Sequence, residues 1–276
     1  MVHDSNSEVD AARCNGSKPA VLPTPTAKNA KLYSMNGAKR GKVLIFNQEN
    51  FDDESYPART GTDKDVERLN HALPRLGFQK EDIEVHKNMM DSEINGIAVN
   101  LENNADLKTS DCLVVVILTH GEENDMLMAK DKAYNLYEFI EKFTPTTLKS
   151  MAGKPKLFII QACRGVPMGY SGRDQVDSKV EIFTYPEFAD LVVVRSSQHS
   201  NYGFLDEQRG SWLIQDLCHV IESCELEKDT IYDILTVTQS AVSERCNAEN
   251  IGFHNTQQIP SIYSTLTKKL YFRPST

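Results

Sequence analysis

Stretches of apolar residues recur along the chain and predict the strands of a sheet. Asp111–His120 is apolar on both of its alternating faces, as a strand that is covered on both sides should be. Lys154–Cys163 has the same two-sided character. Four further stretches complete the set of expected strands: Lys42–Asn47, Glu81–Asn88, Ala189–Ser197 and, at the end of the chain, Ser261–Phe272.

Between these strands, apolar residues repeat at the spacing of helices. The first helix is expected to begin at a cap formed by Thr62 or Asp63, and its apolar face continues to Leu76. Further helices are expected at 91–104, 135–143, 210–225 and 230–246. Strands and helices alternate up to residue 163, which predicts an α/β fold whose mostly parallel sheet carries helices on both faces.

In two regions the apolar residues follow neither the spacing of a helix nor that of a strand. Residues 1–40 are rich in Ser, Asn, Pro and Thr and poor in large apolar side chains, so we expect them to be disordered. Residues 164–187 carry three glycines and two prolines and are expected to form a linker. Ordered structure is therefore expected from about residue 41, with one interruption.

Composition narrows the class of protein. A formal net charge of −9 over 276 residues argues against a general nucleic-acid binder, which would carry a basic surface. The six cysteines form no CxxC pair and no zinc-binding spacing, so no metal and no other cofactor is expected. No signal peptide and no apolar run of membrane-spanning length is visible, which predicts a cytoplasmic protein with reduced thiols and no membrane contact.

Reactive side chains follow two of the strongest predicted strands. His120 and Gly121 end one of them, and Cys163 ends another. If these strands are parallel neighbours, the thiol and the imidazole emerge at the same edge of the sheet, where open α/β sheets bind their ligands. A lone cysteine is more often a buried apolar residue, and a lone histidine is more often structural. The two together favour a nucleophile with its base.

Several motifs together resemble one family. The segments QACRG around Cys163, THGEE around His120, ARTGTDKDVERL, GSW and QQIPSIYSTLTKKLYF are similar, in this order, to segments of caspases. The resemblance is strongest to effector caspases with a short prodomain, those of insects included. It implies one caspase domain over about 41–273, folded as a three-layer sandwich around a six-stranded, mostly parallel sheet.

The resemblance also implies a division of the chain and its roles. Residues 1–40 would be the prodomain, 41–177 the large subunit and 178–276 the small subunit of a zymogen. The cleavage sites would follow Asp177 in the linker and Asp10 in the head, where DQVDS and SEVDA match the family's targets. Cys163 would be the nucleophile and His120 its acid–base partner.

The substrates implied are proteins cut after aspartate. The backbone N–H groups of Gly121 and Cys163 would bind the oxyanion. Arg59 and Gln161 match two of the three family residues that bind the aspartate. Two further residues, Tyr202 and Phe204, would line the neighbouring subsite.

One position departs from the family pattern. Counting back from the Gly-Ser-Trp motif, Leu205 stands where caspases carry the third pocket residue, an arginine. Two functions are therefore considered. One is an aspartate-directed endopeptidase acting in apoptosis, with full or weakened activity; the other is a catalytically weak decoy that regulates an active caspase by pairing with it. The resemblance further implies a homodimer or a heterodimer with another caspase, and inhibitor-of-apoptosis proteins as partners.

Overall fold

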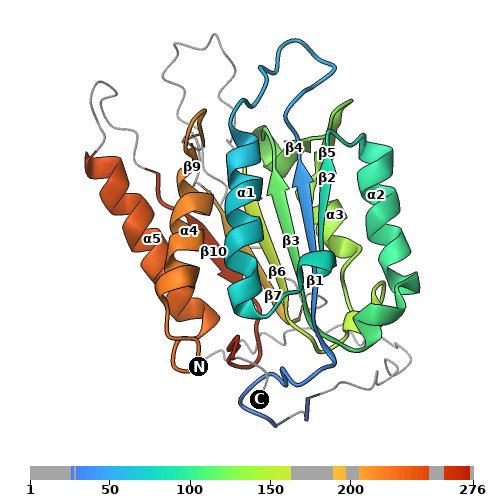
Figure 1. Cartoon of the computed structure of the whole chain (residues 1–276). Helices are drawn as coiled ribbons and strands as arrows, with labels where there is room; N and C mark the ends of the chain where they lie inside the picture. The colour runs from blue at the N-terminus through green and yellow to red at the C-terminus, as the bar shows by residue number, and fades with distance from the viewer. Residues whose placement is uncertain (1–25, 28, 163–188, 197–204, 249–257, 274–276) are drawn as a thin grey trace, which may run out of the picture.

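The computed structural model describes residues 26–27, 29–162, 189–196, 205–248 and 258–273. Over these residues the fold has three layers, a central sheet between two sets of helices (Figure 1). The sheet has six strands in the order β10-β7-β6-β3-β1-β2. β10 runs antiparallel to β7, and the other neighbours are parallel. The predicted six-stranded, mostly parallel sheet with helices on both faces is confirmed.

The six strands match the apolar stretches of the sequence. The two central ones, β3 (Ser110–Leu118) and β6 (Lys156–Gln161), are buried at every position. This two-sided burial explains why both stretches are almost continuously apolar. The remaining strands are β1 (Lys39–Asn47), β2 (Ile83–Lys87), β7 (Leu191–Arg195) and β10 (Ser261–Ser264).

Helices cover the two faces of the sheet separately. α1 (Thr62–Ala72), α4 (Trp212–Ser223) and α5 (Ile231–Ala248) lie on one face (Figure 1). α2 (Asp91–Asn100) and α3 (Leu136–Glu141) cover the other. Because side chains alternate along a strand, Val43 and Ile45 of β1 join the first core, and Leu44 and Phe46 join the second. Short 3₁₀ helices connect several of these elements: Leu73–Leu76, Lys80–Asp82, Leu101–Asn103, Ala105–Lys108, Glu123–Asp125 and Lys149–Met151.

Two short hairpins were not predicted. One consists of β4 (Met126–Met128) and β5 (Ala133–Asn135), and the other of β8 (Leu205–Asp206) and β9 (Gly210–Ser211). Each strand has only two or three residues, too few for a period of two to stand out in the sequence.

Element ends differ from expectation at several places. The cap of α1 is Gly61, in a left-handed conformation, and neither Thr62 nor Asp63. β3 stops at Leu118 rather than at His120, and the last strand stops at Ser264 rather than at Phe272. A little beyond each strand end the chain forms hydrogen bonds outside the six-stranded sheet: the His120 carbonyl accepts the N–H of Met128, and Lys269 pairs with the segment around Leu32.

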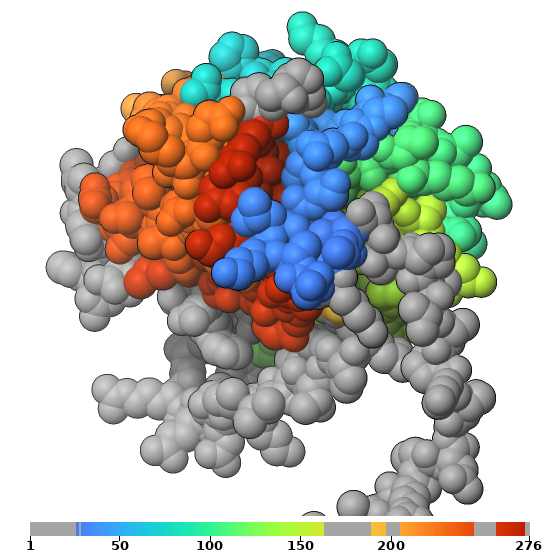
Figure 2. All heavy atoms as spheres, turned by 90° about the horizontal axis from the view of Figure 1, so that it is seen from below, coloured from blue at the N-terminus to red at the C-terminus, as the bar shows by residue number. Residues whose placement is uncertain are grey.

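The segment before residue 40 includes packed residues, in contrast to the expected disorder. Leu32 pairs with Lys269 in a parallel bridge, and two backbone hydrogen bonds of 2.9 and 3.1 Å join this segment to Lys269. The Tyr33 side chain is buried, and its hydroxyl donates to Asp190 at 2.5 Å. Figure 2 shows this blue segment lying against the red C-terminal segment. The described fold therefore begins before the boundary at residue 40.

Among the described residues, none forms a helix with the length and apolar character needed to span a bilayer.

Candidate active site

The ends of β3 and β6 form the centre of the candidate site. These strands are parallel neighbours, and Leu118 lies opposite Gln161 in their register. One residue further on, the N–H of Thr119 donates to the carbonyl of Gln161 at 3.0 Å. His120 therefore leaves the sheet at its carboxyl edge, directly beside the end of β6. This is the arrangement expected if the histidine and the cysteine share one edge of the sheet.

The imidazole of His120 is half-buried and oriented by its surroundings. Its Nε2 lies 2.8 Å from the carbonyl oxygen of Pro57. Because a carbonyl can only accept, Nε2 carries the proton and Nδ1 is the basic nitrogen of the neutral ring. The rings of Phe51 and Tyr56 lie 4.9 and 5.7 Å from the imidazole, centroid to centroid.

The same surroundings change the acidity of His120. Burial lowers the pKa of the imidazole below its ordinary value, and the positive charge of Arg59 acts in the same direction. The Pro57 carbonyl opposes this effect because it accepts a hydrogen bond from the ring. The ring is thus favoured as a neutral base, which is the form that can take a proton from a thiol.

Gly121 lies in an antiparallel bridge with Leu127. The two hydrogen bonds of this bridge use the N–H of Glu122 and the carbonyl of His120, with lengths of 2.8 and 3.0 Å. A residue between two such bonds directs its own N–H away from the partner strand. The N–H of Gly121 therefore points away from the β4–β5 hairpin.

Arg59 is a buried guanidinium with several partners. Its Nη1 donates to the carbonyl of Gln48 at 3.0 Å and to the hydroxyl of Thr62 at 2.9 Å. Its backbone N–H donates to the carbonyl of Glu49 at 2.9 Å. These bonds fix the side chain in one place, so that its position does not depend on a ligand.

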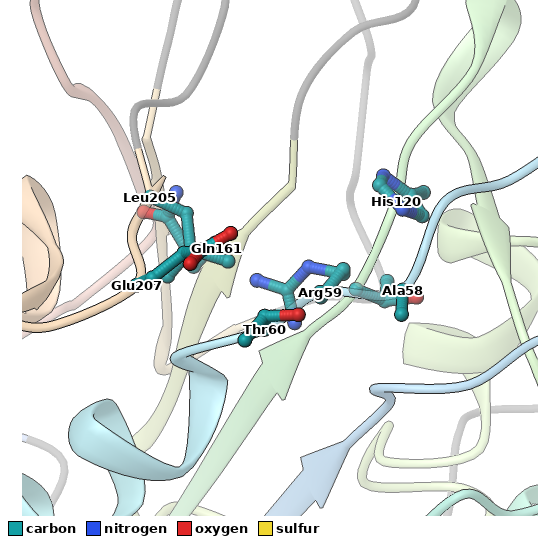
Figure 3. A pocket seen from close by; sticks show the side chains of 8 residues that line it. Ala58, Arg59, Thr60, His120, Gln161, Leu205 and Glu207 are labelled. Atoms are coloured by element: carbon teal, nitrogen blue, oxygen red, sulfur yellow. The ribbon is translucent and has the colours of Figure 1, made fainter.

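A cavity of about 170 Å³ brings the predicted residues together. Figure 3 shows Arg59 between Gln161 and His120 in this cavity. Gln161 is buried, and its amide oxygen has no hydrogen-bond partner among the described residues. The complete lining comprises Ala58, Arg59, Thr60, Thr119, His120, Gln161, Leu205 and Glu207. The guanidinium of Arg59 can donate to a carboxylate, and so can the side-chain N–H groups of Gln161, so these two residues are a fitting environment for one.

One charged residue of this cavity was not predicted from the sequence. Glu207 lines it from the β8–β9 hairpin, two residues after Leu205 (Figure 3). Gly61 permits this approach: a Cβ at Gly61 would lie 2.6 Å from the Cα of Glu207. A carboxylate at the rim opposes the binding of an anionic side chain. Only the three-dimensional position of the hairpin relative to Gly61 identifies Glu207 as a pocket residue.

A buried carboxylate holds the hairpin. Asp65 of α1 accepts the N–H of Ser211 at 2.8 Å and the side-chain N–H of Gln215 at 3.0 Å. Burial raises the pKa of the Asp65 carboxyl, and these two hydrogen bonds counteract the rise. Gly210 has a φ of 88°, and a Cβ there would meet the Asp65 oxygen at 2.4 Å. The contact between α1 and the hairpin therefore requires glycine at this position.

Two other arginines near Leu205 in sequence do not line this cavity. Arg195 forms an ion pair with Asp125, and its Nη2 lies 2.8 Å from the hydroxyl of Tyr137. Arg209 lines a different hollow, formed with α1, α4 and α5. Neither of them therefore supplies a second guanidinium to the cavity that Arg59 and Leu205 line.

Several predicted site residues lie outside the described part of the chain: Cys163, Tyr202, Phe204, Asp177 and Asp10. Across the ranges that are described, no cluster of three or more histidine, cysteine, aspartate or glutamate residues could hold a metal ion. The structure thus brings together His120, Gly121, Arg59 and Gln161.

Comparisons with known proteins agree with this geometry. Residues 40–271 match the family model of the caspase domain. The chain is 35% identical to caspase-1 of Spodoptera frugiperda, over 96% of this chain and 90% of that protein. It is 34% identical to caspase drICE of Drosophila melanogaster, over 90% of this chain and 74% of that protein. The crystal structure of the Spodoptera frugiperda caspase-1 superposes with a TM-score of 0.76, covering 91% of this chain and 97% of the other.

These findings favour an enzyme over a decoy. Caspase-6 of Gallus gallus, at 34% identity, is a further caspase among the relatives. Family membership implies protein substrates cut after aspartate, and it implies dimers. The family match over most of the chain, the fold and the cavity at the sheet edge lead to one conclusion: this chain belongs to the caspase family of cysteine endopeptidases and acts in apoptosis.

Proposed function

We propose that this protein is an effector-type caspase in which Cys163 and His120 cut substrates after aspartate. The observation that carries the proposal is the cavity that joins Arg59, Gln161 and His120 at the carboxyl edge of the sheet. The aspartate side chain would enter between Arg59 and Gln161. Its backbone carbonyl would then lie toward His120, next to the end of β6.

The chemistry follows from the groups present. Nδ1 of His120 takes the proton of the Cys163 thiol, and the thiolate attacks the carbonyl carbon after the aspartate. The N–H groups of Gly121 and Cys163, which both follow strand ends at this edge, stabilise the oxyanion by donating hydrogen bonds to it. The protonated imidazole then gives its proton to the leaving amine, and water releases the acyl group in a second round.

The pocket binds the aspartate with two residues where caspases use three. Arg59 supplies the guanidinium and Gln161 an amide; Tyr202 and Phe204 form the adjacent subsite. Leu205 contributes no charge, and Glu207 adds a negative one at the rim. We therefore propose an active enzyme with weakened affinity for aspartate, since one charge-assisted hydrogen bond contributes about 1.5–3 kcal/mol.

The order of strands in the sheet fits activation by cleavage of the chain. We propose a zymogen whose prodomain ends near residue 40 and which is cut after Asp177 and Asp10. β7 comes from the second part of the chain yet pairs with β6 of the first, so that the two fragments stay joined in one sheet. The processed enzyme would work in the cytoplasm.

We also propose the region Ser261–Thr267 as the dimer contact, with a second copy or with another caspase. β10 occupies the end of the six-stranded sheet, and apolar edge strands invite pairing with a further strand. Tyr263 in this strand is 38% exposed, and Tyr232 of α5 nearby is 40% exposed. Inhibitor-of-apoptosis proteins are the second class of partner, proposed from the family resemblance.

The test is hydrolysis of a fluorogenic peptide ending in aspartate. The wild type should release the fluorophore, and Cys163→Ala should not. Cys224→Ala, which changes a half-buried cysteine outside the site, should keep the wild-type rate. The same peptide ending in asparagine should be cut at least ten times more slowly, because Arg59 binds a carboxylate more strongly than an amide. Full activity of Cys163→Ala would refute the assignment of the nucleophile.

A further inference from the structure

One loop supplies much of the environment of His120. We call residues 49–59, which connect β1 to α1, the rim loop. Its Pro57 carbonyl lies 2.8 Å from Nε2 of the imidazole. The rings of Phe51 and Tyr56 lie 4.9 and 5.7 Å from the imidazole, and 5.9 Å from each other, centroid to centroid. The position of the rim loop therefore determines what surrounds the base.

The rim loop is held by contacts of its own. The N–H of Asp52 donates to the carbonyl of Lys130 at 2.8 Å, and the two side chains form an ion pair. The Asp53 carboxylate accepts the N–H of Ser55 at 2.9 Å, and the Asp53 carbonyl accepts the N–H of Tyr56 at 3.1 Å. These bonds tie the loop to the connection of β4 and β5 and fix the backbone at Tyr56. The phenol ring is thus held beside the imidazole.

The hydroxyl of Tyr56 has an anionic partner. It donates to the carboxylate of Glu122, the residue directly after Gly121, and both side chains are half-buried. Over the described ranges, this phenol is the only hydrogen-bond or ion-pair partner of the Glu122 carboxylate. A hydrogen bond to an ionised acceptor is about twice as strong as one between neutral groups. The phenol is therefore the group that fixes the direction of the Glu122 side chain.

The charge of Glu122 does not act on His120, although the two residues are close in sequence. Burial, the Pro57 carbonyl and the charge of Arg59 are the influences on the pKa of the imidazole. A carboxylate within about 4–6 Å would favour the protonated ring and raise its pKa by one or more units. The hydrogen bond to Tyr56 accounts for the absence of this effect, because it directs the carboxylate toward the rim loop.

Other charged groups on the elements around the ring are held elsewhere. Glu207 lines the cavity on the far side of Arg59 from His120 (Figure 3). Glu54 and Glu123 are exposed to solvent, which screens their charges. Ion pairs join Asp52 to Lys130, Glu49 to Lys87 and Asp125 to Arg195. Glu122 is thus the half-buried carboxylate near the ring that a single neutral hydrogen-bond donor restrains.

We propose that Tyr56 is a positioning residue for catalysis, whose phenol holds the Glu122 carboxylate away from His120 and so keeps the imidazole free to act as a base. This inference rests on the proposed function, because that function makes His120 the base for Cys163. Without the phenol, the carboxylate can turn and accept a hydrogen bond from the protonated imidazole. The resulting ion pair holds the proton on the ring, so that less of the neutral base is present.

The experiment measures kcat and KM for an aspartate peptide between pH 5.5 and 8.5. Tyr56→Phe keeps the ring beside His120 and removes only the bond to Glu122. Its kcat should equal that of the wild type at pH 8 and fall about three- to ten-fold below it at pH 6, with KM unchanged. The reason is that a pKa raised by about one unit reduces the neutral fraction up to ten-fold on the acid side. An unchanged pH profile, or an equal loss at every pH, would overturn the proposal.

A second substitution assigns the effect to the carboxylate. Tyr56→Phe/Glu122→Gln should regain the wild-type rate at pH 6, because no charge remains to approach the imidazole. Tyr56→Phe/Glu123→Gln removes the same charge from the exposed neighbour and should stay as slow as Tyr56→Phe. Tyr271→Phe removes a hydroxyl from the C-terminal segment, outside the site, and should keep the wild-type profile. A failure of Glu122→Gln to rescue Tyr56→Phe would refute the role of Tyr56.

A titration separates this inference from the proposed function. The C2–H signal of His120 can be followed by proton NMR in the Cys163→Ala protein, which needs no catalysis, and His120→Asn in the same background identifies the signal. A higher pKa of His120 in Cys163→Ala/Tyr56→Phe than in Cys163→Ala supports the role of Tyr56 even if no peptide is cut. Equal pKa values in the two proteins overturn it even if the enzyme is active.

Discussion

Thr119 donates its backbone N–H to the carbonyl of Gln161, at 3.0 Å, one residue beyond the end of β3. This single bond extends the ladder between β3 and β6 to the point where the candidate active site begins. It fixes the distance between the strand that leads to His120 and the strand that leads to Cys163. Catalytic residues on rigid strand ends are held more closely than residues on long loops.

Leu205→Arg should increase kcat/KM for aspartate peptides by about ten-fold or more, because the guanidinium adds a charge-assisted bond to the substrate carboxylate. Steady-state kinetics with aspartate and asparagine peptides would measure the gain, which should be much smaller for asparagine. Leu205→Met is the matched control without a charge and should leave the rate near that of the wild type. An unchanged rate in Leu205→Arg would mean that Leu205 does not occupy the position of the caspase arginine.

Asp177→Ala should leave a single chain on a denaturing gel after exposure to an active caspase. The wild type should give two fragments that elute together under native conditions, since β7 hydrogen-bonds to β6 across the cut. If the variant is divided at the same rate as the wild type, another site is used.

Asp65→Ala should destabilise the protein by about 1–3 kcal/mol, because the N–H groups of Ser211 and Gln215 lose their acceptor in a buried place. It should also raise KM for aspartate peptides, since the β8–β9 hairpin carries part of the pocket. Asp65→Asn keeps one acceptor oxygen and should be milder in both respects. Urea unfolding and peptide kinetics would measure the two effects, and wild-type values for Asp65→Ala would contradict the role of this carboxylate.

His120 should make stability depend on pH. Burial lowers the pKa of His120 in the folded protein. Below about pH 6.5, the imidazole therefore binds a proton more readily in the unfolded chain than in the folded one. Stability is therefore highest above the unfolded pKa and falls as the pH drops through the folded pKa. Urea unfolding at pH 7.5 and 5.5 should show a smaller loss for His120→Asn than for the wild type; equal losses would count against the burial of this ring.

Tyr33→Phe should cost about 1.5–3 kcal/mol, because the hydroxyl donates to the Asp190 carboxylate at 2.5 Å and accepts the N–H of Thr267 at 3.0 Å. A cut after Asp177 would leave Tyr33 on the N-terminal side of the cut and both partners on the C-terminal side. After cleavage at Asp177, the variant fragments should separate at a lower urea concentration than those of the wild type. Native gel electrophoresis across a urea series would detect this, and coincident transitions would argue against the bond as a link.

The central sheet could be predicted because burial on both faces leaves a simple signal. β3 and β6 are buried at every position, and their apolar stretches identify them without other information. Their ends were less certain. His120 continues the apolar pattern of β3, yet its carbonyl binds Met128 of a hairpin too short to be recognised in sequence.

Residues of the pocket could be predicted only where they belong to a recognisable sequence motif. Arg59 and Gln161 lie in motifs that resemble those of caspases, and the cavity contains both. Glu207 lies in no such motif, and its position depends on the close approach of the hairpin to Gly61. Tyr33 was likewise missed, because one buried aromatic residue in a polar segment gives no period to detect. Contacts between segments distant in sequence account for both omissions.

The bridge between Leu32 and Lys269 brings the first and last described segments side by side, and Arg40 adds a 2.6 Å hydrogen bond to the carbonyl of Arg273. The described part of the chain thus begins and ends at neighbouring positions. The chain could be opened between residues 162 and 189 and joined at its ends without crossing any strand of the sheet. The order of the two halves along the polypeptide is thus a matter of connectivity, and the sheet would accept the second half before the first.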